Sequence, residues 1–110
     1  MTTTPTTAHP AFRVDRFDVP PTALEPFMAR LRTTQRLLGE LEGCRQNLVL
    51  QGTERGDSIA VVTIVEWSSE HAMAAAKTAM QAHYAHEGFE PAAFMRELRV
   101  RPDMDVYRPV

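Results

Sequence analysis

Three histidines and one tyrosine in the second half of the sequence are the side chains best suited to acid–base chemistry. They are His71, His83, Tyr84 and His86. Histidine titrates near neutral pH, so His83 with Tyr84 is the candidate pair for moving protons. The alternative is that His83 is a histidine at the C-terminal end of a helix, where the helix dipole favours it. No carboxylate or cysteine stands at a convincing ligand spacing from these histidines, so we predict no metal site.

Asn47 and Arg45 offer hydrogen-bonding groups on one face of a predicted strand. If this face is covered by helices, Asn47 could bind a substrate hydroxyl or a reduced oxygen species. If it is the opposite face, both residues lie at the rim of a dimer. Cys44 follows Gly43 with no adjacent base, which favours a packed thiol over a nucleophile.

Composition excludes several classes of function. The chain has 110 residues, a net charge of −2 and a single cysteine. There is no basic patch for nucleic acid or an anionic membrane, and no internal disulfide is possible. No apolar run approaches about 18 residues, and no signal-peptide pattern occurs, so we expect a cytoplasmic protein without membrane attachment. No glycine-rich phosphate loop occurs, so we expect no nucleotide, flavin or other bound cofactor.

The stretch Ser58–Trp67 predicts the central strand of a sheet. It is rich in β-branched residues and follows the turn residues Gly56 and Asp57. The two-residue strand period divides it into two largely apolar faces, which indicates that both faces are covered. One face carries Ile59, Val61, Thr63, Val65 and Trp67, and the other carries Ala60, Val62, Ile64 and Glu66.

The remaining elements surround this strand. Thr22 and Glu25 have the spacing of a capping box, and either of two serines after Trp67 could cap the second helix. The segments expected are a flexible tail (1–11), a strand (12–19), a helix from 22 to Gly39 or Gly43, a strand (44–53), a turn (54–57), a helix (70–84), a loop (86–90), a short helix from 91 and a last strand (99–107). This order predicts one α+β domain over residues 12–110, with the ferredoxin-like split βαβ arrangement, a four-stranded antiparallel sheet and helices on one face.

Two helices cover only one face of such a sheet, so an apolar face is left without a cover. It would carry Ala60, Val62 and Ile64, or the opposite set of β-strand residues if the two faces are assigned the other way round. The simplest partner is a second copy of the chain, sheet against sheet, which closes a barrel of eight strands. The sequence therefore predicts a homodimer through the sheet face.

Three segments resemble the antibiotic biosynthesis monooxygenase (ABM) family of dimeric α/β barrels. They are Leu-Leu-Gly-Glu-Leu-Glu-Gly-Cys44, Val-Val-Thr-Ile-Val-Glu-Trp67-Ser-Ser-Glu-His-Ala72 and Tyr107-Arg-Pro109. The resemblance runs from about Phe12 to Pro109. It implies a pocket between the sheet and the helices, with Trp67 in its wall. Other residues expected to line it are Thr63, Val65, Phe27, Leu31 and Met73.

The chain departs from the family pattern at several positions. Quinone-forming members have an Asn four residues before the Trp and a Tyr six residues after it, where this chain has Thr63 and Met73. Haem-degrading members have an Asn in the first strand, which this strand lacks, and a His where Lys77 stands, so we do not expect haem degradation. The resemblance implies cofactor-independent monooxygenation of a small aromatic or polyketide-like substrate.

Two other functions stay open on the same scaffold. One is a non-catalytic dimeric binding or accessory protein, which the loss of the Asn and Tyr favours. The other is isomerase or cyclase chemistry, which would use the same acid–base residues. Trp67 fits either function, because it could stack on an aromatic ligand or anchor the second helix to the sheet.

Overall fold

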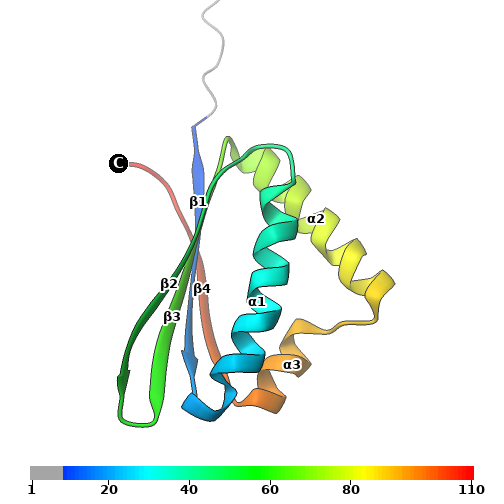
Figure 1. Ribbon diagram of the computed structural model, residues 1–110. Helices are drawn as coiled ribbons and strands as arrows, with labels where there is room; N and C mark the ends of the chain where they lie inside the picture. Colours follow the sequence, from blue (N-terminus) through cyan, green and yellow to red (C-terminus); the bar gives the residue numbers. More distant parts are fainter. Residues whose placement is uncertain (1–8) are drawn as a thin grey trace, which may run out of the picture.

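The computed structural model describes residues 9–110 and shows one antiparallel sheet with three helices on one side (Figure 1). The strands lie in the order β2-β3-β1-β4. The α+β ferredoxin-like fold predicted from the sequence is thereby confirmed. The elements are β1 (Ala11–Val19), a 3-10 turn (Pro21–Ala23), α1 (Leu24–Gly39), β2 (Cys44–Arg55), β3 (Ser58–Trp67), α2 (Glu70–Glu87), α3 (Pro91–Leu98) and β4 (Arg101–Tyr107).

Burial alternates along β3 and identifies the side of the sheet that the helices cover. Ile59, Val61, Thr63, Val65 and Trp67 are all buried, whereas the residues between them are partly exposed. We call the covered side the inner face and the other side the open face. β3 lies between β2 and β1, as predicted for a central strand.

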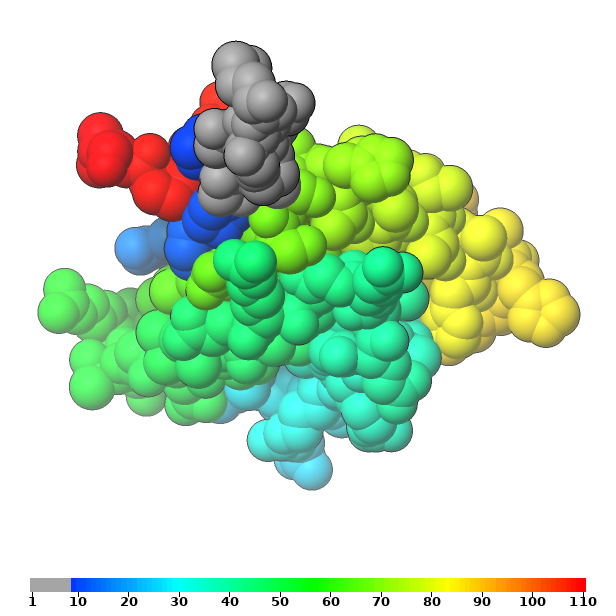
Figure 2. Space-filling model, turned by 90° about the horizontal axis from the view of Figure 1, so that it is seen from above, coloured from blue at the N-terminus to red at the C-terminus, as the bar shows by residue number. Residues whose placement is uncertain are grey.

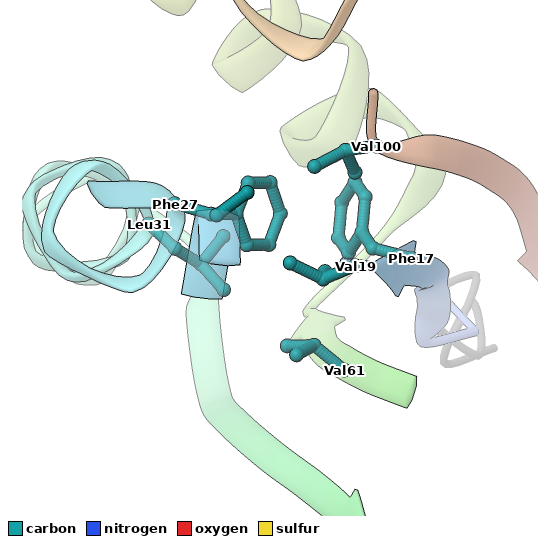
Figure 3. Packing of buried hydrophobic residues seen from close by; sticks show 7 residues of the cluster. Phe17, Val19, Phe27, Leu31, Val61 and Val100 are labelled. Atoms are coloured by element: carbon teal, nitrogen blue, oxygen red, sulfur yellow. The ribbon is translucent and has the colours of Figure 1, made fainter. Parts of the chain in front are cut away.

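Two apolar clusters fill the space between the inner face and the helices. The first, the Phe17 cluster, joins β1 and β3 to α1 (Figure 3), and the Phe17 and Phe27 rings lie 5.0 Å apart. The second, the Trp67 cluster, joins the end of β3 to α2. The buried residues of the Phe17 cluster are Phe17, Val19, Ala23, Phe27, Leu31, Val61 and Val100, and those of the Trp67 cluster are Val65, Trp67 and Ala76.

The start of α1 differs from the prediction. Pro21 begins a 3-10 turn, Thr22 lies inside this turn, and the N-cap of α1 is Ala23, which makes no side-chain capping bond. The predicted capping box of Thr22 and Glu25 is therefore wrong. The reason is that the φ angle fixed by proline favours a helical turn already at Pro21, so Thr22 cannot take the extended backbone of a cap.

α2 begins as predicted but ends three residues later. Ser69 is its N-cap and accepts a hydrogen bond of 3.0 Å from the backbone N–H of Ala72. The helix continues to Glu87 because Gly88, with φ of 74°, is the residue that takes the left-handed conformation that ends it. His86 and Glu87 are thus helical and not part of a loop. Similarly, Arg99 with φ of 60° ends α3, so β4 starts two residues later than predicted, at Arg101.

β2 is two residues longer than expected and forms a hairpin with β3. Its turn consists of Gly56 and Asp57 alone, and Gly56 has the positive φ, 60°, that such short turns require.

The sheet and the C-terminal end of α2 lie at opposite sides of the molecule, because α2 runs away from the sheet (Figure 2).

Candidate functional site

Polar side chains interrupt the inner face between the two apolar clusters. Arg13 and Asp15 lie in β1 and alternate in step with Phe17, which is buried under α1, so both point to the inner face. Strand pairing sets Asp15 opposite Thr63 of β3 and Arg13 opposite Val65. We call the group of Arg13, Asp15 and Thr63 the Asp15 site.

The Asp15 site contains an ion pair that is partly withdrawn from water. The Nε of Arg13 donates a hydrogen bond of 2.7 Å to Oδ1 of Asp15, whose side chain is only 17% exposed. Burial raises the pKa of the Asp15 carboxyl above its ordinary value, and the nearby Arg13 offsets this effect only in part. The site thus holds a carboxylate that accepts a proton more readily than one in water.

One side of the Asp15 site is not covered by the helices. Met104 lies opposite Asp15 and Val106 opposite Arg13 in the edge strand β4, and these two apolar residues are 41% and 40% exposed. The Nη2 of Arg13 also approaches Sδ of Met104, at 3.1 Å. An apolar surface therefore adjoins a cation and a carboxylate, which is a suitable arrangement for a flat molecule with an ionisable group.

The predicted pocket residues lie in the inner core. Trp67, Thr63 and Val65 are 2%, 3% and 3% exposed, and Met73 packs against the Trp67 cluster. Trp67 thereby anchors α2 to the end of β3, as one of the two roles considered for it requires. Thr63 also belongs to the Asp15 site.

Phe27 and Leu31 belong to the Phe17 cluster instead. They point from α1 toward β1 and β3 (Figure 3) and are 4% and 8% exposed. Phe27 packs on the Phe17 ring. These two side chains thus support the sheet that carries the Asp15 site.

Asn47 faces the inner side of the sheet, where its amide binds α1. It pairs with Val65 across the strands. Its Oδ1 accepts a hydrogen bond from Nε2 of Gln35, and its Nδ2 donates to the Gln35 carbonyl oxygen at 2.6 Å. Of the two positions considered for Asn47, the structure shows the face that the helices cover and not the rim of a dimer, and its amide links β2 to α1. Gln35 stands four residues after Leu31 on the buried stripe of α1, and this spacing could have identified it as buried.

His83 lies near the end of α2, roughly 15 Å along the helix axis beyond Met73. Its side chain is 43% exposed, and its Nε2 lies 3.7 Å from Oε1 of Glu87. It lines a surface pocket of about 310 Å³ between α1 and α2. The other residues of this pocket are Leu37, Glu40, Leu41, Ala79 and Met80.

Tyr84, next to His83, joins a cluster of aromatic rings around an ion pair. Its ring packs on Phe89 with 5.5 Å between centroids. The guanidinium of Arg30 lies 3.4 Å from the Phe89 centroid and makes two hydrogen bonds to Glu87, of 2.6 and 2.7 Å. These bonds lower the pKa of Glu87. The structure therefore groups His83 and Tyr84 with the Arg30–Glu87 pair, which joins α1 to the end of α2.

Arg13 and Asp15 are the members of the site that the sequence analysis did not single out. Only part of the signal was present in the sequence, because the strand period sets both residues on the side of Phe17 and Val19 but does not say which side the helices cover. Among the residues that the structure describes, no group of three or more His, Cys, Asp or Glu is placed to hold a metal ion. Over the same 9–110 range, no helix is both long and apolar enough to cross a membrane.

Three solved structures share this arrangement of elements. SnoaB, a cofactor-independent oxygenase from Streptomyces nogalater, is 24% identical, with a TM-score of 0.66 and coverage of 93% of this chain and 94% of its own. A dimeric ferredoxin-like protein from an uncultured marine organism is 11% identical, with a TM-score of 0.71 and coverage of 93% and 96%. A conserved protein from Methanosarcina mazei Go1 is 20% identical, with a TM-score of 0.67 and coverage of 94% and 96%.

At these identities the three structures show a shared fold. None of the curated proteins matches the chain. The model of the family described as antibiotic biosynthesis monooxygenase matches residues 10–93, which include β1, α1, β2, β3 and α2. The chain belongs to the antibiotic biosynthesis monooxygenase family.

Proposed function

We propose that this protein is a cofactor-independent monooxygenase that binds a small aromatic or polyketide-like molecule between the sheet and the helices. The observation that carries the proposal is the Arg13–Asp15 ion pair on the inner face, next to the exposed apolar residues of β4. Membership of the family supports it. So does the fold shared with SnoaB, an oxygenase that needs no cofactor.

The proposed reaction needs no electron donor other than the substrate. A ring CH₂ group beside a carbonyl or phenol loses a proton, and the resulting anion reduces dioxygen. The CH₂ group and one O₂ then become a carbonyl group and one water. The protein would supply orientation, with Thr63 beside the ion pair and with Val65 and Trp67 packed behind it in the core.

We further propose that the protein works as a homodimer through its open face. Pairing sets Leu48, Ile64 and Val14 in one row across the strands, and Leu50 and Val62 in the next. Leu48 and Leu50 are 37% and 49% exposed although both are large and apolar. Covering this patch with a second copy would remove it from water. The dimeric ferredoxin-like neighbour supports this assembly.

Oxygen uptake tests the proposed activity. The purified protein is mixed with anthrones and dihydroxynaphthalenes in the presence of a metal chelator and without cofactor. We expect a rate of oxygen uptake that saturates with substrate. This rate should differ between the wild type and Thr63→Val, because the substitution removes a hydroxyl from the site at nearly constant volume. Loss of uptake in His83→Ala would instead move the site to the α1–α2 pocket.

The same compounds distinguish the alternative function. A non-catalytic binding protein is favoured by Thr63 and Met73, which stand where quinone-forming members have an Asn and a Tyr. Thermal stabilisation by these compounds without oxygen uptake would support that alternative. If no compound of the panel causes thermal stabilisation or oxygen uptake, both proposed functions are contradicted.

A further inference from the structure

We propose that Asp15 is the proton acceptor of the site and that Arg13 transfers its hydrogen bond from Asp15 to the substrate oxygen as the proton moves. This inference rests on the proposed function, because it assigns the first step of the same reaction. It also narrows the substrate class. The substrate would carry an acidic C–H or O–H group next to an oxygen on a flat, apolar ring system.

The position of Asp15 supports this role. Its carboxylate lies on the inner face between the two apolar clusters, opposite Thr63 and Met104, neither of which titrates. The charge that acts on it comes from Arg13, whereas Asp103 and Asp105 of β4 alternate to the open face. A ring resting on Met104 and Val106 would therefore meet one base and one cation at its edge.

The Arg13–Asp15 ion pair keeps the net charge of the site constant during the proton transfer. Before the transfer, Arg13 is positive and Asp15 is negative. The substrate proton then moves to an Oδ atom of Asp15, and the electron pair of the broken bond stays on the substrate and is shared with its oxygen. Arg13 then pairs with this oxygen anion instead of the neutral carboxyl. The site has the same net charge before and after, so no unpaired charge forms in a partly dry place.

The environment of Asp15 suits a base rather than a structural ion pair. Because burial raises its pKa, the folded protein binds this proton more tightly than the unfolded chain does. Asp15 thus stabilises the folded protein most at low pH. This contribution is lost as the pH rises from 3.8, the ordinary pKa of the carboxyl, through its raised pKa in the folded protein. Near neutral pH the ionised carboxylate disfavours folding, as is common for groups kept for their chemistry.

The sequence provides a matched control for Asp15. Arg16 and Asp18 repeat the Arg-x-Asp pattern three residues later in β1, but on the open face, with 3.7 Å between Nη2 and Oδ1. Asp15→Asn and Asp18→Asn therefore make the same chemical change on the same strand. Only Asp15→Asn removes a carboxylate from the inner face.

The test has two readouts, one of which does not need oxygen. Under nitrogen, the absorbance of dithranol, a dihydroxyanthrone, reports formation of its anion on the protein. In air, an oxygen electrode reports turnover. We expect Asp15→Asn to slow both by about 100-fold or more, as the loss of a general base does. Asp18→Asn should keep both rates, and Asp15→Glu should restore part of the rate.

Controls separate a catalytic role from a structural one. In the wild type we expect the rate of anion formation to rise with pH as Asp15 loses its proton, and in Asp15→Asn this inflection should be absent. Asp15→Asn should unfold in urea at pH 7 at the same concentration as the wild type or a higher one. A clearly lower unfolding midpoint with an unchanged pH profile would assign Asp15 to structure.

The possible failures can be told apart. Full rates in Asp15→Asn would overturn the role of Asp15 and leave the monooxygenase proposal standing. Anion formation in the wild type without oxygen uptake would support Asp15 as the base and contradict the monooxygenase. Dithranol that binds to the wild type without forming its anion would overturn the inference.

Discussion

Two hydrogen bonds join Gln35 of α1 to Asn47 of β2. The Gln35 side-chain amide donates to Oδ1 of Asn47, and the Asn47 amide donates to the backbone carbonyl oxygen of Gln35. Gln35 is 8% exposed, so water cannot easily replace a missing partner. A buried polar group without a partner costs more than the hydrogen bond itself gains, because the group has been taken out of water. The role of Asn47 can therefore be decided by stability measurements.

We predict that Asn47→Ala lowers the free energy of unfolding by about 1–3 kcal/mol. The reason is that the Gln35 side chain would lose its acceptor while staying buried. Urea denaturation followed by circular dichroism measures the change. The double variant Gln35→Leu, Asn47→Leu should recover part of the loss, because it removes both polar groups. Unchanged stability in Asn47→Ala, together with lost oxygen uptake, would show a contact with substrate instead.

The strand period predicted that Thr63, Val65 and Trp67 share one face, and the family resemblance implied that the helices cover it, but the sides of β1 were harder to assign. Its apolar residues change side between Val14 and Phe17, so the pattern supports covering by helices on either face. Packing against α1 determines which face of β1 is covered, and this packing joins residues far apart in the sequence. The Asp15 site could not be proposed before that packing was known.

At the scale of elements, Gly43 closes the junction where β2 begins, β3 ends and α2 starts. Its φ is 89°, and its carbonyl oxygen accepts a hydrogen bond of 2.8 Å from the Ser68 N–H. A Cβ at this position would lie 2.6 Å from Cβ of Ala72 and 2.8 Å from Oγ of Ser68. Both the backbone conformation and the space therefore require glycine.

We predict that Gly43→Ala lowers the free energy of unfolding by about 2 kcal/mol or more, because strain and overpacking add. Gly52→Ala is the control, since a Cβ there would meet its nearest neighbour at 3.5 Å and no positive φ is involved. Thermal and urea unfolding of the two variants would be compared. Equal stability of the two would contradict the argument.

The ends of the elements were predictable where one residue determines them. A serine cap correctly predicted the start of α2, where Ser69 is the N-cap. The end of α2 was predicted three residues too early, although Gly88 with its positive φ marks it. Prediction failed at Pro21, where two local signals compete and proline prevails over the cap at Thr22. The orientation of α2 away from the sheet depends on packing and could not be predicted from local residues.

At the scale of the whole molecule, the predicted homodimer would bury the apolar rows of the open face. We predict that Leu50→Glu shifts the protein toward monomers, because two added carboxylates would come close to the partner's apolar surface. Light scattering after size-exclusion chromatography measures the mass. Thr78→Glu, on the exposed side of α2, is the control and should leave the mass unchanged. A wild-type protein that is already monomeric would contradict the dimer.

The order of the strands in the sheet also sets the order in which the site can form during synthesis. β1 pairs with β4, so Phe12 lies opposite Tyr107 although nearly the whole domain separates them in the chain. While β4 is still inside the ribosome, β1 can pair with β3, but Arg13 and Asp15 lack Met104 and Val106 beside them. The Asp15 site is thus completed by the last strand to emerge, and a nascent chain carries its base before it carries the surface on which a substrate would rest.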